Sequence, residues 1–213
     1  MQAKKVGVLG SGDVGKVLAA GFKRHGYEVM IGSRSGDKLA DWSAANGIAE
    51  GTMQAAAAFG EIVVLAVGGG VAADAVGLAG EALAGKVVID ACNPIGGPPV
   101  DGVLQFFTGP NESLMERLQA LAPTARFVKS FSCVGNALMV NPSLPGGRPT
   151  MFICGDDKDA KATVQGILEL FGWDSEDMGG VKSARAIEPL CQLWCISGFL
   201  HNSWGHAFKL LKP

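Results

Sequence analysis

Short apolar runs alternate with longer segments of helical period along most of this chain of 213 residues. The apolar runs predict strands near residues 5–10, 28–32, 48–50, 62–67, 86–91, 126–131, 150–154 and 173–178. The segments between them predict helices near 13–25, 36–46, 53–58, 71–83, 112–121 and 157–171. Such alternation is typical of an α/β fold, in which a doubly wound, mostly parallel sheet is flanked by helices.

Polar residues and a proline mark the ends of the later helices. Asn111 is expected to cap the helix near 112–121, and Asp156 or Asp157 is expected to cap the helix that ends near 171. From Ser183 a long apolar helix is predicted to run to about residue 210. Pro189 should kink or restart that helix, because proline has no backbone N–H to donate.

Two segments rich in proline and glycine, 93–110 and 140–149, are expected to be loops. The first lies beyond the C-terminal end of a predicted strand, which is where open α/β sheets bind their ligands. We therefore assign it to the binding site, either as a lid or as a rigid proline turn.

The first predicted strand leads into a turn of the form G-x-G-x-x-G, made of Gly10, Ser11, Gly12, Asp13, Val14 and Gly15. Its glycines permit a tight turn, close approach of a phosphate and close packing of the next helix. A pyrophosphate would lie at the helix N-terminus, where free N–H groups meet its charge. This context favours a Rossmann dinucleotide-binding domain over residues 1–180 rather than a turn without a ligand. Residues 181–213 then form a C-terminal helical segment that is not an independent domain.

The end of the second predicted strand indicates which dinucleotide binds. An NAD site places a carboxylate there to hold the ribose 2′-hydroxyl. This chain has Ser33, Arg34 and Ser35 instead, followed by Lys38. Arg34 can fork to a 2′-phosphate or stack on adenine, and the serine hydroxyls can donate to the phosphate. The pattern predicts NADP(H); the alternative is that Arg34 is only a solvated loop charge.

The composition of the chain limits the kinds of partner that it is expected to bind. The chain is 48% hydrophobic and 18% charged with a net charge of −2, which argues against nucleic acid as a partner. No apolar run is long enough to cross a membrane, and Met1–Lys5 leads directly into a strand without a secretory signal. The five cysteines are odd in number and form no C-x-x-C pair. We expect a cytoplasmic protein with reduced thiols.

The chain offers few acid–base candidates. His25 is expected far from a nicotinamide, and His201 and His206 fall on the terminal helix, where a structural role is the simpler interpretation. With Cys191 and Cys195 these two histidines could suggest a metal, but their spacing of five does not place both on one helical face, so no metal site is predicted. We name no catalytic residue, because hydride transfer between two cofactor rings needs none.

The remaining candidate residues stand at the ends of the central strands. Ala66, Val67 and Gly68 open the turn that continues through Gly69 and Gly70, and bare backbone there would let a ring or ribose lie close. A tight turn without a ligand is the equal alternative. Asn93 could bond to a nicotinamide ribose, and Pro94 would hold its turn.

Several segments together resemble the F420-dependent NADP reductase family and the cytosolic NADPH-oxidising domain of the STEAP metalloreductases. The resemblance covers nearly the whole chain and rests on Val8–Gly15, Val29–Arg34, Asp90–Pro94, Phe127–Phe131, Ile153–Asp157 with Ala160 and Lys161, Asp177–Gly179, Ser183–Arg185 and Glu188–Leu190. It implies NADP(H) binding through the glycine turn, Ser33 and Arg34, a homodimer formed by the C-terminal helix, and a deazaflavin or flavin as hydride acceptor.

The chain departs from the family at Gly68–Gly70, where many members carry an aromatic or charged residue with a histidine. Two other functions therefore stay open beside a deazaflavin or flavin reductase. One is an NADP-dependent imine or β-hydroxyacid dehydrogenase, although those enzymes usually carry a longer helical C-terminal domain. The other is an NADP-binding protein without catalysis. A homodimer is also predicted from the residues alone, because the C-terminal segment has more large apolar side chains than one helix face can bury: Leu190, Leu193, Trp194, Ile196, Phe199 and Leu200.

Overall fold

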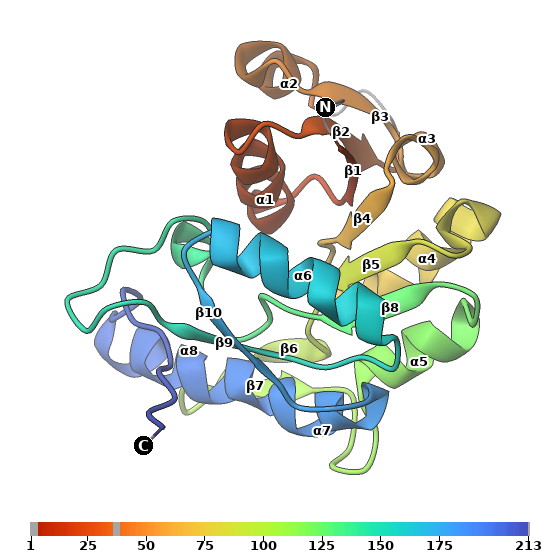
Figure 1. Cartoon of the computed structure of the whole chain (residues 1–213). Helices are drawn as coiled ribbons and strands as arrows, with labels where there is room; N and C mark the ends of the chain where they lie inside the picture. The colour runs from red at the N-terminus through yellow and green to blue at the C-terminus, as the bar shows by residue number, and fades with distance from the viewer. Residues whose placement is uncertain (1–3, 36–38, 213) are drawn as a thin grey trace.

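A six-stranded sheet forms the centre of the computed structural model, which describes residues 4–35 and 39–212 (Figure 1). Its strands follow the order β3-β2-β1-β4-β5-β8, and every neighbouring pair is parallel. The strands are β1 (Lys5–Leu9), β2 (Glu28–Ser33), β3 (Ala49–Thr52), β4 (Ile62–Leu65), β5 (Val87–Asp90) and β8 (Arg126–Lys129). This is the strand order of a dinucleotide-binding Rossmann sheet, so the predicted fold class is confirmed.

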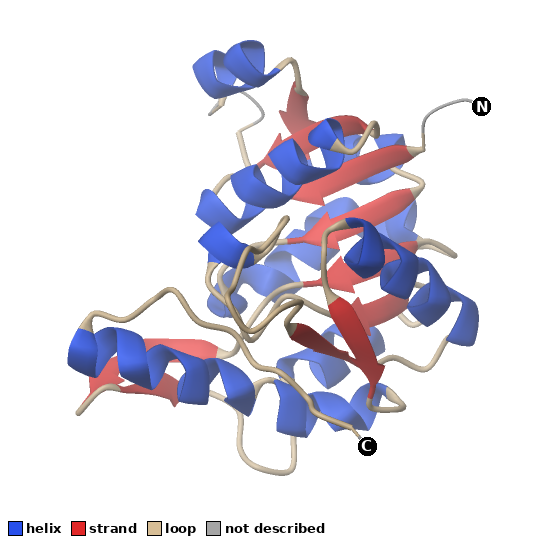
Figure 2. Ribbon diagram, turned by 60° about the vertical axis from the view of Figure 1, so that its left-hand side comes forward, coloured by secondary structure: helices blue, strands red, loops and turns tan. Residues whose placement is uncertain are grey.

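Helices cover both faces of the sheet (Figure 2). Residues of α1 (Asp13–Arg24) and α6 (Lys158–Leu170) pack in one layer of the core, and residues of α3 (Met53–Phe59), α4 (Ala72–Ala79) and α5 (Leu114–Leu121) pack in the other. Successive residues of a strand face opposite layers, as Val63 and Val64 do in β4. The inner strands β4 and β5 read as nearly continuous apolar runs because both of their faces are buried, whereas β3 at the sheet edge does not.

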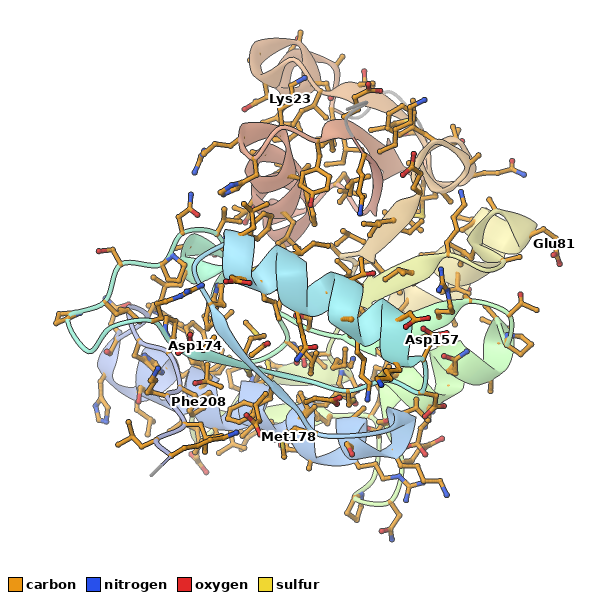
Figure 3. The ribbon with its side chains drawn as sticks, in the orientation of Figure 1. Lys23, Glu81, Asp157, Asp174, Met178 and Phe208 are labelled. Carbon is orange, nitrogen blue, oxygen red and sulfur yellow. The ribbon has the colours of Figure 1, made fainter. Side chains whose placement is uncertain are left out.

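The boundaries of these helices differ from the predicted ones in small, explicable ways. α4 is shorter than the predicted 71–83 because a 3-10 turn precedes it and another follows it. Asp157 caps α6, accepting a hydrogen bond from the Ala160 N–H at 2.7 Å (Figure 3). The predicted Asn111 cap is wrong: Ser113 caps α5 through a reciprocal pair of bonds with Glu116. The helix α2 (Ala40–Asn46) begins later than predicted, after a stretch outside the described residues.

The predicted loop 93–110 is wrong in part, because it contains an antiparallel hairpin. β6 (Ile95–Val100) pairs with β7 (Val103–Phe106) through an irregular register. Asp101 and Gly102 both take positive φ, 49° and 80°, which suits the tight turn between two strands. Pro98 and Pro99 hide the strand in the sequence, since proline cannot donate to a ladder and is tolerated only in such exposed, irregular pairs.

The predicted long C-terminal helix is also wrong in its extent. α7 (Ala184–Ile187) and α8 (Pro189–His201) are separate, and Pro189 stands in the first turn of α8, so the proline restarts the helix. Asn202 takes a left-handed conformation and ends α8. Residues 202–212 then return along the molecule as an extended strap, in which Trp204 and His206 lie against Trp194.

The strap joins a second, smaller sheet. β9 (Thr150–Ile153) and β10 (Asp174–Asp177) form a parallel pair beside α6. The Thr150 N–H donates to the Phe208 carbonyl at 2.8 Å, and the Leu210 N–H donates to Oγ1 of Thr150 at 3.1 Å. Across the described residues, no helix has both the length and the apolar character required to span a membrane.

Candidate functional site

The glycine turn after β1 stands at the carboxyl edge of the sheet, where each glycine has different surroundings. Gly10 has a φ of +133°, and a Cβ there would lie 2.1 Å from the Ala66 carbonyl oxygen. A Cβ on Gly15 would lie 2.1 Å from the carbonyl oxygen of Gly10. Gly12, by contrast, has no heavy atom within 4 Å of the position a Cβ would take. The turn therefore packs tightly on one side and leaves bare backbone on the other.

Two connected grooves run over this bare backbone. The first, which we call the Arg34 groove, has a volume of about 620 Å³ and is lined by residues that include Gly10, Ser11, Arg34, Ser35 and Asp74. The second, the Asn93 groove, has about 540 Å³ and is lined by residues that include Asp13, Val14, Gly70, Asn93 and Ile95. Gly12, Ala66, Val67 and Gly68 line both grooves.

A third hollow of about 610 Å³ lies near Arg126, the first residue of β8, and therefore at the amino end of a sheet strand. Ligands of open α/β sheets bind at the carboxyl ends of the strands. We therefore place the candidate site in the two connected grooves rather than in this hollow.

The end of β2 brings a cation to the Arg34 groove. Arg34 and Ser35 are exposed and line the groove, whereas Ser33 is buried and is not among its lining residues. Within 4–35 and 39–212, the structure gives Arg34 no ion pair with a carboxylate. Lys38, also predicted to lie here, falls outside the described residues.

The turn after β5 brings an amide to the other groove. Nδ2 of Asn93 donates to the Ser132 carbonyl at 2.9 Å, which holds the side chain in place. Oδ1 of Asn93 is buried and has no hydrogen-bond partner among the described residues, so it can still accept a bond. Pro94 does not line either groove; its carbonyl accepts from the Phe107 N–H at 2.9 Å and ties the hairpin to the turn.

The three glycines in the turn after β4, Gly68, Gly69 and Gly70, have different surroundings. A Cβ on Gly69 would lie 2.0 Å from the Asn93 carbonyl oxygen, so the middle glycine is needed for packing of the two turns. Gly68 and Gly70 have no heavy atom within 4 Å of a Cβ position. The predicted bare backbone is therefore present at Gly68 and Gly70, while Gly69 serves the fold.

A buried ion triad of Lys129, Asp90 and Glu188 holds the turn that carries Asn93. Nζ of Lys129 lies 2.6 Å from Oδ2 of Asp90 and 2.9 Å from Oε1 of Glu188, and all three side chains are almost completely buried. Lys129 also donates to the Cys92 carbonyl at 3.0 Å, and Oδ1 of Asp90 accepts from the Cys92 N–H at 2.9 Å. Both backbone polar groups of the residue before Asn93 are thus held by the triad.

Electrostatics keep Lys129 charged at the centre of this triad. Burial by itself would lower the pKa of Lys129, but the neighbouring carboxylates of Asp90 and Glu188 outweigh it and raise the pKa above its usual value. Glu188 also accepts the N–H groups of Leu114 and Met115 at 2.9 and 3.0 Å, at the start of α5. The triad thereby joins β5, β8, α5 and the start of α8.

Sequence reasoning missed this triad and several lining residues. Met53, Val71, Asp74 and Leu78 line the Arg34 groove, and Ile95 of the hairpin lines the Asn93 groove. A usable signal exists for Val71 and Asp74, since a helix that follows a strand at the carboxyl edge turns its first residues toward the ligand.

No histidine or cysteine is among the described residues that line the two grooves. Nε2 of His25 is 3.1 Å from Oδ1 of Asn141, and Nε2 of His206 is 3.1 Å from the Trp194 carbonyl oxygen. All five thiols are free, and burial raises the pKa of Cys133 to about 12. In the part of the chain that the structure describes, no three His, Cys, Asp or Glu side chains are grouped to hold a metal ion.

The fold and the glycine turn define the class: an α/β protein of the dinucleotide-binding type. Residues 5–94 match the family described as NADP oxidoreductase, coenzyme F420-dependent. A crystal structure of a candidate F420-dependent NADP reductase from Arthrobacter sp. FB24 superposes with a TM-score of 0.91 at 30% identity, covering 99% of this chain and 100% of the other. The chain belongs to the coenzyme F420-dependent NADP oxidoreductase family, whose members depend on NADP.

Two curated relatives agree with this assignment. The chain is 33% identical over 191 residues to the metalloreductase STEAP3 of Rattus norvegicus, covering 89% of this chain and only 36% of that protein. It is 28% identical over 204 residues to the F420-dependent NADP reductase of Methanothermobacter marburgensis, covering 89% of this chain and 90% of that protein. An imine reductase from Streptomyces aurantiacus shares the fold, with a TM-score of 0.67 at 19% identity.

Proposed function

We propose that this NADP-dependent oxidoreductase transfers a hydride from NADPH to a flavin or deazaflavin ring. One observation carries the proposal: two grooves that share Gly12, Ala66, Val67 and Gly68 lead from Arg34 to Asn93, and Asp13 is the only ionisable residue among the described residues that line the Asn93 groove. Transfer between two rings needs alignment rather than an acid or base. NADPH, held by the glycine turn and Arg34, would supply the hydride to the flavin N5 or deazaflavin C5, and water would supply the proton that completes the reduced ring.

The residues of the site fit a dinucleotide. The open space at Gly12 would let a pyrophosphate reach the N-terminus of α1, which has no side-chain cap. We assign Arg34 and Ser35 to the 2′-phosphate of NADPH, and the unpartnered Oδ1 of Asn93 to a ribose hydroxyl or the carboxamide. Residues 1–180 would then act as the cofactor-binding domain.

The role of the chain at the reacting end is to hold two flat rings against each other. Val14, Gly68 and Gly70 present small or absent side chains to the Asn93 groove, which leaves room for ring faces. The buried triad holds the Asn93 turn on the opposite side. Rings kept at a separation of about 3.5 Å react as if at a very high effective concentration.

A second candidate function is reduction of an imine, which Asp13 favours. Its carboxylate lies in the Asn93 groove, where a positively charged iminium would be attracted to it. A third possibility, NADP binding without catalysis, would leave NADPH unoxidised with every acceptor.

The assembly and location of the protein are also proposals. Leu193 and Leu200 of α8 are 56% and 54% exposed, and Leu200 lies against Gly102 of the hairpin, so that α8 and the hairpin form one apolar surface. We propose that this surface joins two copies as a homodimer. The five free thiols favour a reducing cytoplasm.

A screen of acceptors tests the proposed function. Purified protein is mixed with NADPH and coenzyme F420, FMN, FAD, riboflavin or a cyclic imine, and NADPH oxidation is followed by absorbance. We expect turnover with a flavin or deazaflavin and little with the imine. The reverse result would favour imine reduction, and no turnover with any acceptor would contradict an enzymatic function.

A matched pair of glycine variants tests whether the reaction takes place at the junction of the two grooves. Gly68→Val keeps an ordinary backbone conformation, with φ of −60°, yet fills the junction of the grooves. Turnover should fall at least about tenfold, a loss of about 1.4 kcal/mol in transition-state stabilisation, with an unchanged unfolding midpoint. Gly146→Val, at a loop glycine that also has open space but lies outside both grooves, should leave turnover unchanged.

A further inference from the structure

The turn after β8 contains a residue in a backbone conformation that its side chain does not favour. Phe131 has a φ of 61°, in the left-handed region, and its side chain is buried. A bulky residue rarely adopts this conformation, and such strain persists only where the surrounding structure imposes it. Strain of this kind gathers at binding sites, so its effect on the neighbouring turn matters.

Contacts on both sides of Phe131 impose its conformation. The Ser130 N–H donates to the Asp90 carbonyl at 3.0 Å, so the chain follows β5 as far as that residue. The Phe131 N–H then donates to Sδ of Met151 at 3.2 Å, and the centroid of its ring lies 6.2 Å from that of Phe171. The chain therefore leaves the sheet at Phe131 in a direction that these contacts fix.

This change of direction brings two turns together at the carboxyl edge of the sheet. The carbonyl of Ser132 accepts from Nδ2 of Asn93 at 2.9 Å. Because Nδ2 and Oδ1 lie on opposite sides of the amide, this bond also fixes Oδ1 of Asn93, which is an acceptor. Oδ1 of Asn93 and Oγ of both Ser130 and Ser132 are buried without a hydrogen-bond partner among the described residues. Strain and unpartnered oxygens thus occur together beside the Asn93 groove.

We propose that Phe131 is a positioning residue of the NADP site and that it acts through Asn93. Its left-handed backbone brings the Ser132 carbonyl to Nδ2 of Asn93, and this bond holds Oδ1 ready to accept from an N–H or O–H of the nicotinamide riboside half of NADPH. This inference rests on the proposed function for the orientation of NADPH, with its 2′-phosphate at Arg34 and its nicotinamide half in the Asn93 groove. It holds for any hydride acceptor.

Two substitutions of Phe131 separate backbone conformation from packing. Phe131→Gly removes the whole side chain but adopts a positive φ readily, whereas Phe131→Val keeps an apolar side chain and, being β-branched, avoids that region. NADPH fluorescence without a hydride acceptor gives the Kd of each variant. Phe131→Val should raise the Kd at least about fivefold, the net value of one hydrogen bond, and Phe131→Gly should stay within about twofold of the wild type. Loss of packing alone predicts the reverse order.

Adenosine 2′,5′-bisphosphate locates the effect within the site. This ligand carries the 2′-phosphate but lacks the nicotinamide half, so it would occupy only the Arg34 groove. Its Kd, measured by competition with NADPH, should be the same for the wild type and for every variant. If Phe131→Val weakens both ligands equally, the damage is general and a role through Asn93 is contradicted.

Variants of Asn93 test the link without changing the buried turn. Asn93→Asp keeps an oxygen that can accept but has no N–H for the Ser132 carbonyl, so it should lose as much NADPH affinity as Asn93→Ala. Adding Phe131→Val to Asn93→Ala should cause no further loss, because the two residues act as one unit. Asn46→Asp is the matched control, since Asn46 also donates to a backbone carbonyl, that of Trp42, at 2.7 Å but lines neither groove.

The outcomes separate this inference from the function on which it rests. If NADPH binds to Phe131→Val or to Asn93→Asp as tightly as to the wild type, or if the losses of Phe131→Val and Asn93→Ala add, the positioning role is wrong while the proposed function stands. If Phe131→Val does not fold, the comparison of Asn93→Asp with Asn93→Ala decides. If the wild-type protein does not bind NADPH, both proposals are overturned.

Discussion

The three glycines of the turn after β1 do different physical work at the scale of single residues. Gly10 holds a backbone conformation that other residues rarely adopt and lies against the Ala66 carbonyl, so it serves the fold. Gly12 has ordinary dihedral angles, with φ of −81°, and faces open space, so its missing side chain serves the ligand. Two substitutions to alanine can separate these roles.

We expect Gly10→Ala to destabilise the protein and Gly12→Ala to weaken its cofactor binding. Gly10→Ala should lower the free energy of unfolding by about 1–3 kcal/mol, because the added Cβ strains the backbone. Gly12→Ala should leave stability nearly unchanged and raise the Kd for NADPH at least about tenfold, or about 1.4 kcal/mol. Thermal unfolding and NADPH fluorescence titration measure the two effects, and equal stability of both variants would contradict the argument.

Arg34 is the residue that we expect to choose the cofactor. NADPH should bind at least about tenfold more tightly than NADH, and Arg34→Ala should remove most of that difference by weakening NADPH alone. Arg24→Ala is a suitable control, because Arg24 ends α1 and lines neither groove. Titrations with both cofactors decide the matter: equal losses for NADH and NADPH would show that Arg34 does not contact the 2′-phosphate.

At the scale of elements, the buried triad links the sheet to the C-terminal helices. Lys129→Met should lower the free energy of unfolding by about 3–5 kcal/mol, since it leaves two buried carboxylates without their cation. Adding Glu188→Gln should restore part of that loss by removing one of those charges. Urea unfolding measures both variants. Arg117→Met breaks the exposed Arg117–Glu112 pair and should change the free energy of unfolding only slightly. A loss as large as that of Lys129→Met in this control would contradict the special stabilising role of the triad.

The sequence predicted the elements whose periodicity is undisturbed. All six strands of the central sheet, and the helices that separate them, lie within a few residues of their predicted places, because buried parallel strands form continuous apolar runs between glycines. The hairpin was missed since Pro98 and Pro99 mask a strand, although Asp101-Gly102 is itself a hairpin signal. The C-terminal helix was overextended because Trp204 and Phe208 continue the apolar pattern after Asn202 has ended α8.

Only those parts of the candidate site that are formed by neighbouring residues in the sequence could be predicted. The glycine turn and Arg34–Ser35 each follow a strand, so their meeting at one sheet edge could be foreseen. The triad could not, because Asp90, Lys129 and Glu188 are far apart in the sequence and an ion pair has no periodic pattern. The role of Gly69 against the Asn93 carbonyl likewise depends on how two turns meet.

At the scale of the whole molecule, the apolar surface of α8 and the hairpin leads to a prediction about assembly. Leu193→Asp should convert the proposed homodimer to a monomer, because a charge cannot be buried there without a partner. Leu121→Asp is the control, since this leucine of α5 is 53% exposed and lies on another face. Light scattering after size-exclusion chromatography measures both masses. A wild-type protein that is monomeric at micromolar concentration would contradict the prediction.

The strap of residues 202–212 has a consequence for solubility. It holds the first residue of β9 through Thr150 and Phe208, while the Lys129 N–H donates to the Cys154 carbonyl just beyond the other end of the same strand, at 2.9 Å. An open strand edge is a template on which other chains can pair and aggregate. With both of its ends engaged, β9 does not present a long unpaired edge within the described residues, and we expect the strap to limit pairing of this strand with other chains.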